Sequence, residues 1–259
     1  MKHIPRFGAA GIFTVLALLC AGPLSAYAAA TAPGLGAAAN FVVLGGAGVT
    51  CTGSTVAGNV GSKLTVTQTG CNITGAIHQG DTTAVNAFNN FVTAYNTLKG
   101  EGCSPANHLT GQELAGKTLG PGVYCFATTA DLTSGTLTLK GPSSGVWVFQ
   151  VGTGITTDTA NVVMDGGSPC NVYWALGTTA TIGKNTNFQG NILAGTAVTF
   201  TGANSSLVGR ALAKTAVTMT GTTISGCTGT VVKPPKHHQG KGKDHHGHHH
   251  RDGKHHGRW

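Results

Sequence analysis

Threonine recurs at matched positions in four short segments of the sequence. Each segment reads Thr-x-x-Thr, and aligning them gives a first column, Thr153, Thr178, Thr196 and Thr215, and a second column, Thr156, Thr181, Thr199 and Thr218. If the segments are neighbouring strands about 4.7–4.9 Å apart, each column repeats a methyl and a hydroxyl group at that step. Methyl groups order the water around them and hydroxyl groups hydrogen-bond that water, so the array could match a repeating surface. The alternative is that threonine serves only as a good strand former that solubilises a sheet without charge.

The two columns pose a geometric difficulty. Positions i and i+3 of a regular strand face opposite ways, so both columns can share one surface only if a bulge or bend lies between them. We expect the second column to face outward, because apolar residues that would face inward flank each of its threonines, as Val198 and Phe200 flank Thr199.

Groups that could carry catalysis are few and scattered. The acidic residues between positions 31 and 232 do not fall at matching positions of the repeat: Asp81, Glu101, Glu113, Asp131, Asp158 and Asp165. Glycoside-cleaving enzymes need paired carboxylates. His78 and His108 are the only histidines of this region, and no serine or cysteine lies in a nucleophile motif. We therefore expect no enzyme, and we expect Trp147 and Trp174, which lie in apolar strand runs, to fill the core.

The strands that must position the threonines repeat along the chain. Between residues 31 and 232, short runs of Val, Ile, Thr, Phe and Leu alternate with Gly and Asn, which is typical of short strands joined by tight turns. Residues 188–194 are matched by residues 207–213, and a weaker echo relates residues 58–60 to residues 75–77. The repeats are 17 to 25 residues long, the length of one turn of a three-sided β-helix. The sequence therefore predicts a β-solenoid rather than a sandwich.

One segment predicts a helix instead. From residue 81 to residue 98 the apolar positions follow the period of one helical face: Ala84, Phe88, Phe91, Tyr95 and Leu98. Asp81 or Thr82 can cap its start, and Gly100 can end it. We expect this helix to pack along the solenoid, and residues 101–126, which break the repeat, to cap one end.

The net charge of +8 is not spread over the fold. Residues 233–259 contribute a net charge of +5 and residues 31–232 only +1. The partner of the body is therefore not recognised mainly by charge, and we expect no nucleic-acid partner. The length of residues 31–232 fits a single domain, which we expect to be a monomer.

The N-terminus is typical of an exported protein. Lys2, His3 and Arg6 precede an apolar run that is too short to span a bilayer, and Ala26-Tyr27-Ala28 offers an A-x-A cleavage site. We interpret residues 1–28 as a signal peptide and expect a secreted or periplasmic protein without a membrane span. A lipoprotein signal at Cys20 is the alternative, although Leu19 is bulky for such a signal.

Six cysteines remain after removal of the signal peptide. An even number in an exported chain favours disulfides. We expect nearest neighbours to pair: Cys51 with Cys71, Cys103 with Cys125, and Cys170 with Cys227.

The C-terminal tail, residues 233–259, is rich in histidine and has almost no apolar residue to bury, so we expect it to be disordered. Five of its histidines are close enough to share a zinc, copper or nickel ion: His245, His246, His248, His249 and His250. Its other plausible role is pH-dependent adhesion to anionic envelope polymers. For the folded body we expect no cofactor.

Six further segments resemble one known family. They read LGAAANFVVL at 35–44, TGAIHQGD at 74–81, LGPGVY at 119–124, VFQVG at 148–152, CNVYW at 170–174 and GRALA at 209–213. In order and content they resemble the ice-binding-like family, also described as the domain of unknown function 3494. The resemblance implies an all-β fold, a discontinuous right-handed β-helix of triangular section with one long helix packed alongside.

Active members of that family adsorb to ice through one flat face that often carries a T-A/G-x-T/N motif. The segments that begin at Thr153, Thr196 and Thr215 fit this motif, whereas the segment that begins at Thr178 departs from it at Thr179. The resemblance thus implies an ice-binding, antifreeze protein whose site is formed by the eight threonines of the two columns. The alternative is a structural or adhesive surface protein, metal-linked through its tail.

Overall fold

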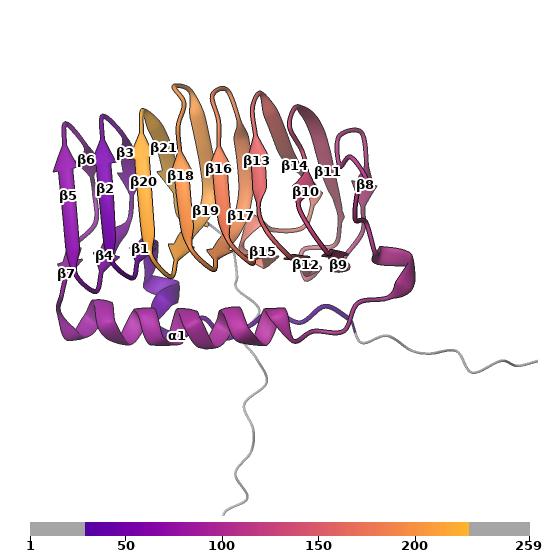
Figure 1. Cartoon of the computed structure of the whole chain (residues 1–259), viewed down its shortest axis with the longest axis horizontal. Coiled ribbons are helices and arrows are strands. Elements are labelled where there is room, and N and C mark those ends of the chain that lie inside the picture. The colour runs from indigo at the N-terminus through magenta and orange to yellow at the C-terminus, as the bar shows by residue number, and fades with distance from the viewer. Residues whose placement is uncertain (1–28, 228–259) are drawn as a thin grey trace, which may run out of the picture.

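The computed structural model describes residues 29–227, which form a stack of coils with one long helix along its length (Figure 1). Each complete coil contributes strands to three parallel sheet faces, which gives the solenoid a three-sided section. Among the described residues, no helix combines the length and the apolar character needed to cross a membrane.

The face that carries the two threonine columns, called here the threonine face, is a seven-stranded sheet in the order β10-β13-β16-β18-β20-β2-β5. Its strands are β10 (Ala130–Asp131), β13 (Ile155–Thr157), β16 (Thr179–Ile182), β18 (Ala197–Phe200), β20 (Ala216–Thr220), β2 (Gly48–Thr52) and β5 (Thr65–Thr69). All neighbouring strands of this sheet are parallel and in continuous register.

A second face carries several asparagines and is called the asparagine face. Its strands are β8 (Thr118–Leu119), β11 (Gly135–Gly141), β14 (Ala160–Gly166), β17 (Asn187–Ala194), β19 (Ser205–Ala213), β21 (Thr222–Ser225), β3 (Thr55–Ala57) and β6 (Asn72–Ile73).

The third face lies under the helix and is called the helix face. Its strands are β9 (Gly122–Phe126), β12 (Trp147–Val151), β15 (Val172–Leu176), the second halves of β17 and β19, β1 (Phe41–Gly45), β4 (Asn59–Ser62) and β7 (Ile77–Gln79). The long strands β17 and β19 turn the corner between two faces at Gly190 and Gly209, which have positive φ angles of 112° and 153°. A β-carbon at Gly209 would collide with the carbonyl of Gly190 in the next coil, so both the turn and the stacking require glycine here.

The order of coils in space differs from their order in the chain (Figure 1). The first two coils lie at one end of the stack, helix α1 (Thr82–Lys99) then runs to the opposite end, and the remaining coils return. The last coil docks on the first, because β20 pairs with β2, β19 with β1 and β21 with β3. The solenoid is therefore discontinuous, as the family resemblance implied.

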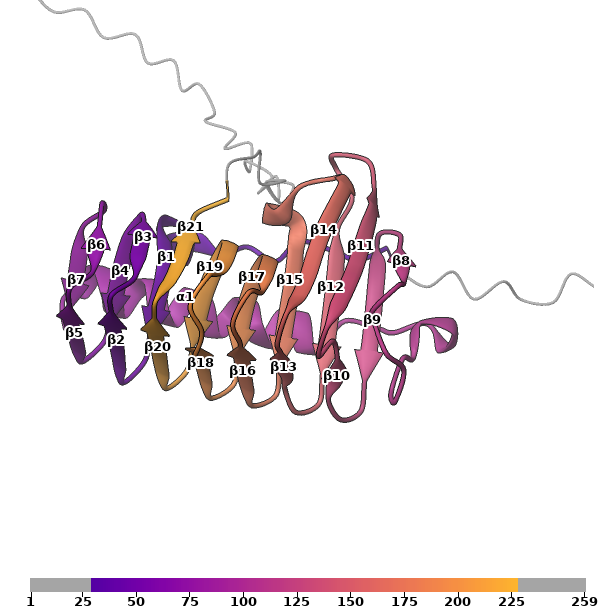
Figure 2. The same ribbon diagram turned by 90° about the horizontal axis from the view of Figure 1, so that it is seen from above.

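Helix α1 packs on the helix face and covers it along the stack (Figures 1 and 2). Its buried side chains are Ala84, Ala87, Phe91, Ala94, Tyr95 and Leu98. They contact the outward apolar residues of the sheet, among them Leu44, Tyr173 and Leu193. The amphipathic stripe predicted from the sequence thus lies on the solenoid, where apolar burial stabilises both parts.

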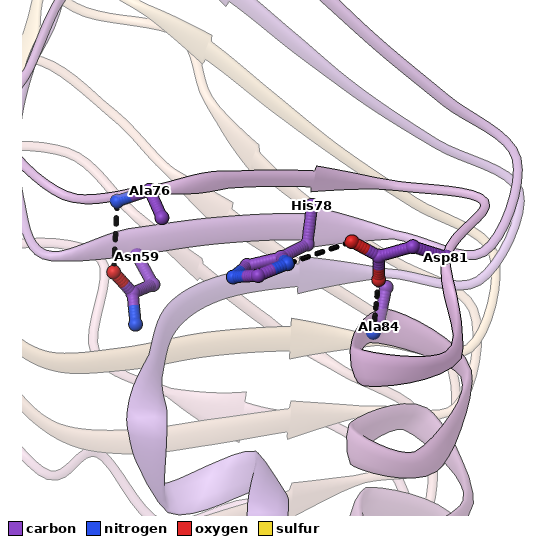
Figure 3. A network of polar contacts seen from close by, with 5 residues as sticks. All are labelled: Asn59, Ala76, His78, Asp81 and Ala84. Atoms are coloured by element: carbon purple, nitrogen blue, oxygen red, sulfur yellow. Dashed lines mark hydrogen bonds and ion pairs between the residues drawn. The ribbon is translucent and has the colours of Figure 1, made fainter.

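A polar network fixes the start of α1 (Figure 3). The Asp81 carboxylate accepts the Ala84 backbone N–H through Oδ1 and lies 2.7 Å from His78 Nδ1 through Oδ2. In the same region Asn59 Oδ1 accepts the backbone N–H of Ala76 from the next coil. The helix ends at Gly100, whose N–H bonds back to Asn96.

The interior of the solenoid is apolar and closely stacked. Four rings from successive coils form one pile: Tyr124, Phe149, Trp174 and Phe188. Trp147 and Trp174 are fully buried, in agreement with the core position expected for them.

The segment that was expected to cap one end lies at the end opposite the first coils. It contains the 3-10 helix η2 (Pro105–Asn107) and the edge strand β8. Its last residues are not an added cap, because they form β9, an ordinary strand that pairs with β12. The other two 3-10 helices are η1 (Gly36–Asn40), beside α1, and η3 (Pro169–Asn171), before β15.

Two of the three expected disulfides are present in the structure, Cys51–Cys71 and Cys103–Cys125. The structure also brings together the sulfur atoms of the third expected pair, Cys170 and Cys227, within hydrogen-bond reach of each other.

Candidate functional site

The second column of threonines forms one unbroken row across the threonine face. Strand pairing places Thr156 beside Thr181, Thr181 beside Thr199, and Thr199 beside Thr218. At a step of about 4.8 Å between strands, the hydroxyl and methyl groups repeat regularly along the stack.

The row continues into the first two coils of the chain. Thr218 pairs with Thr50 of β2, and Thr50 pairs with Thr67 of β5. The complete row is Thr67, Thr50, Thr218, Thr199, Thr181 and Thr156, a length of about 24 Å at that step. The repeats identified in the sequence did not include Thr50 and Thr67. Their spacing equals the 17 residues that separate Asn59 from Ala76, so extending that echo aligns Thr50 with Thr67, although it does not align either residue with Thr218.

The first column also lies in register, and all four of its threonines are exposed. Each precedes its strand, because β18 begins at Ala197 and β20 at Ala216. The chain turns at this corner, so a residue three positions before the second column reaches the same side of the molecule. The bend that the two columns require is therefore the corner of the solenoid. The backbone N–H of Thr196 bonds to Thr178 and that of Thr215 to Thr196, which continues the ladder through the corner.

Small residues separate the two columns on most coils. The position between them is Gly154, Ala197, Ala216 or Gly48, and it is a threonine at Thr179 and Thr65. Because the residues between the columns are small, the threonine side chains on either side project furthest from the surface. Thr179 is exposed, so the departure from the motif does add a larger side chain to this face.

The hydroxyl groups of the second column make no hydrogen bond to any other residue within 29–227. Thr156, Thr50 and Thr67 are exposed, whereas Thr181, Thr199 and Thr218 are half-buried. These hydroxyls are therefore available to water, and the row is held in place by the backbone ladder rather than by side-chain bonds.

The threonine face is nearly free of charge. Its row ends at Asp131, which pairs with Thr156 and accepts a hydrogen bond from the Thr129 hydroxyl. Two lysines that precede strands of this face lie over rings of the helix. Lys214, before β20, has its Nζ 3.9 Å from the ring centre of Tyr95, and Lys63, before β5, has its Nζ 4.5 Å from that of Phe88. Such cation–π contacts hold the ammonium groups away from the threonines.

The other two faces lack this combination of solvent-accessible, unbonded hydroxyl groups and near absence of charge. The helix face is covered by α1. On the asparagine face the polar side chains bond to one another, because Asn187 donates to Asn161 and Ser206 donates to Asn187, both at 2.8 Å. The same face carries the Lys140–Asp165 ion pair, in which hydrogen bonding to Asp165 raises the pKa of the Lys140 ammonium.

The structure brings together no metal-ligand cluster of three or more His, Cys, Asp or Glu side chains among residues 29–227. His245, His246, His248, His249 and His250 lie outside the described residues. His78 is the partner of Asp81 at the helix start, and His108 forms an isolated bridge with Cys125.

The fold and this face define a β-solenoid whose one uncovered, nearly uncharged surface is a regular array of hydroxyl and methyl groups. The chain belongs to the Ice-binding-like family, whose profile matches residues 38–225. The family is not an enzyme family.

Relatives that are described as ice-binding proteins match this chain. An ice-binding protein of Nostoc sp. (strain HG1) is 42% identical over 174 residues, which cover 64% of this chain and 64% of the relative. An ice-binding protein of Flavobacterium frigoris (strain PS1) is 29% identical over 182 residues, which cover 63% and 66%. The chain thus spans slightly less than two thirds of the length of these two relatives.

Solved structures share the fold. The crystal structure of an ice-binding protein from the Antarctic ascomycete Antarctomyces psychrotrophicus superposes with a TM-score of 0.70 at 31% identity, covering 75% of this chain and 98% of that one. An ice-binding protein from an Antarctic biological consortium gives a TM-score of 0.73 at 31% identity and covers 78% and 94%. The expected fold and family are confirmed.

Proposed function

We propose that this protein binds ice and that the threonine face is the adsorbing surface. The observation that carries the proposal is the continuous row of six threonines, whose hydroxyls bond to no other described residue. The relatives named above, which are described as ice-binding proteins, support the same conclusion.

The physical basis is a match between two repeating surfaces. Methyl groups at a fixed step favour ordered water, and hydroxyl groups hydrogen-bond that water in place. Because charge is nearly absent, no strongly hydrated ion disturbs this layer. An adsorbed protein blocks the addition of water molecules to the crystal, so ice growth and recrystallisation slow. Adsorption is a binding event and requires no cofactor.

An ice-recrystallisation assay on the full chain tests the proposal. We expect crystals to stay small in the presence of the wild-type protein and to coarsen with Thr199→Tyr and with Thr218→Tyr, because the ring stands above the row. If the wild-type protein lets crystals coarsen as buffer does, ice binding is wrong. If it inhibits coarsening and both variants match it, the threonine face is the wrong surface.

We also propose that the protein is exported and that residues 1–28 are removed. Ice forms outside cells, and the paired cysteines fit an oxidising compartment. The mass of the mature chain from the culture medium tests this proposal, because cleavage after Ala28 leaves Ala29 as the first residue.

A further inference from the structure

Glu101 is a partly buried carboxylate without a cationic partner among the described residues. The salt bridges of residues 29–227 are His78–Asp81 and Lys140–Asp165. Glu101 Oε2 accepts only the backbone N–H of Thr31, at 3.4 Å, and Oε1 is buried with no hydrogen bond at all. Burial raises the pKa of this carboxyl group, although the Thr31 amide partly opposes the shift. An ionised carboxylate with a buried, unsatisfied oxygen is costly, so the site calls for a further donor.

A cavity of about 130 Å³ adjoins this carboxylate. Its lining residues are Ala29, Thr31, Glu101, Gly102 and Val123. Ala29 also lines the neighbouring cavity, beside Gly102 and Val123. The first described residue of the chain therefore lies at the same place as the unsatisfied carboxylate.

The chain near Ala29 is short enough to bring its backbone nitrogen to Glu101. Two residues of chain span at most about 7 Å, and Thr31 already contacts the carboxylate. The Thr31 hydroxyl also donates to the Ala29 carbonyl at 3.3 Å, which turns the segment back on itself.

The carboxylate is held on a rigid segment. The Gln150 side-chain amide donates to the backbone carbonyls of Leu98 and Glu101, each at 2.7 Å. Two residues further on, Cys103 is bonded to Cys125. Glu101 is thus positioned in advance at the end of α1.

We propose that Glu101 is the docking site for the α-amino group that forms at Ala29 when the signal peptide is removed. Before cleavage the Ala29 nitrogen is a neutral amide with one donor. After cleavage it is an ammonium group with three donors, and it is charged at neutral pH because a free α-amino group has a pKa of about 7.7–8.0. The ammonium supplies both the charge and the hydrogen bond that Oε1 lacks. The proposal depends on the proposed export, not on ice binding.

Docking of the α-amino group links removal of the signal peptide to the stability of one end of the solenoid. The N-terminus is fastened to the segment that joins α1 to the terminal coil, where the stack has no further coil to cover it. The processed chain is therefore more stable than a chain whose amino group is displaced from Glu101.

The test compares four exported, full-length proteins whose N-termini are verified by mass: wild type, Glu101→Gln, wild type with Gly-Ser-Gly inserted after Ala28, and the insertion combined with Glu101→Gln. The insertion leaves three residues ahead of Ala29 and removes the charge from it. We expect the insertion to lower the Tm at pH 6.5 by about 2–4 °C, which is the shift that a moderate loss of stability produces in a domain of this size. In the Glu101→Gln background the insertion should not lower the Tm further, because the carboxylate that binds the α-amino group is already absent.

A second measurement follows the amino group itself. The rate of α-amine acylation at pH 7, read from the mass of the N-terminal peptide, should rise about tenfold in Glu101→Gln, which corresponds to 1.4 kcal/mol of protection. Glu113→Gln is the matched control, because Glu113 is exposed, and it should leave both readouts unchanged. Any of three results would overturn the proposal. The Tm could be equal with and without the insertion in the wild-type background, the acylation rates of wild type and Glu101→Gln could be equal, or the mature chain could begin at a residue other than Ala29. If the exported chain starts at Ala29 but the insertion and Glu101→Gln act independently on the Tm, the docking proposal is wrong and the export proposal stands.

Discussion

Thr50 of β2 lies in register with Thr218 of β20, although the two residues lie near opposite ends of the described chain. This pairing joins the first coil to the last and carries the threonine row across the point where the chain is discontinuous. The length of the row therefore depends on a contact between two distant parts of the sequence. Because a longer regular array contacts more ordered water, the first coils should contribute to adsorption as much as the central ones.

We accordingly predict that Thr50→Tyr weakens inhibition of ice recrystallisation. The ring would stand above the row, one step from its end at Thr67, so the protein could no longer approach the crystal evenly. The concentration that halves crystal coarsening should rise about tenfold, which corresponds to about 1.4 kcal/mol of adsorption free energy. Thr223→Tyr is the matched control, because Thr223 is exposed on the asparagine face in register with Ser206. Equal inhibition by the two variants would show that the first coil is not part of the adsorbing surface.

The sequence predicted the coil register well where consecutive coils are also neighbours in space. The matched segments at Gly190 and Gly209, and the pairing of Thr199 with Thr218, are found as expected. Repeats of nearly constant length place equivalent residues side by side because each coil stacks on the previous one.

The missed part of the site has a physical reason. Thr50 meets Thr218 only because helix α1 carries the chain to the opposite end of the stack before the later coils return. No periodicity in the sequence encodes that docking. The corner that lets both threonine columns face outward could not be predicted from the sequence either, because the alternation of side chains is a rule for straight strands.

A second prediction concerns the charged end of the threonine row. Asp131 occupies the position next to Thr156 and places a carboxylate at the end of the row. Asp131→Thr extends the row by one step of about 4.8 Å and moves the first charge one position further out, to Glu113, which bridges to residue 131. We expect lower protein concentrations to suffice for the same inhibition of recrystallisation. Asp165→Thr, which makes the same substitution on the asparagine face, should leave the activity unchanged. Reduced inhibition by Asp131→Thr would contradict the idea that a longer uncharged row adsorbs better.

A third prediction follows from the polar network at the start of α1. The hydrogen bond from the Ala84 amide, and then that from His78, lower the pKa of Asp81 below its ordinary value of 3.8. A group with a lowered folded-state pKa stabilises the fold above its unfolded-state pKa, and this stabilisation is lost as the pH falls through the folded-state value. The Tm difference between wild type and Asp81→Ala should therefore be constant above about pH 5 and shrink below pH 4. Thermal unfolding from pH 2 to pH 7 measures it, with Asp158→Ala as the control. A difference that does not change over this range would mean that the carboxylate does not act through its charge.

The last prediction concerns the thiol pair formed by Cys170 of η3 and Cys227, which lies at the end of the final coil. Cys170 precedes β15, Cys227 follows β21, and their thiols share a hydrogen bond. The hydrogen bond from Cys227 lowers the pKa of the Cys170 thiol, and the buried guanidinium of Arg210, 3.1 Å from Cys227 Sγ, adds to the effect. The lowered pKa favours the thiolate form of Cys170, and thiolates rather than thiols attack disulfides.

We expect oxidised glutathione to close this pair. The Cys170 thiolate attacks one sulfur of glutathione disulfide and releases one glutathione thiolate. The Cys227 thiol then loses its proton and displaces the second, so that two protein thiols become one disulfide and one glutathione disulfide becomes two glutathione molecules. The bond would close a loop long enough to stabilise the fold by about 4 kcal/mol, which in a domain of this size should raise the Tm by at least about 5 °C. Intact mass, thiol titration and thermal unfolding measure the change, and the double variant Cys170→Ser, Cys227→Ser should not respond to the oxidant. Two titratable thiols that persist after oxidation would show that the fold holds the two sulfur atoms too far apart to bond.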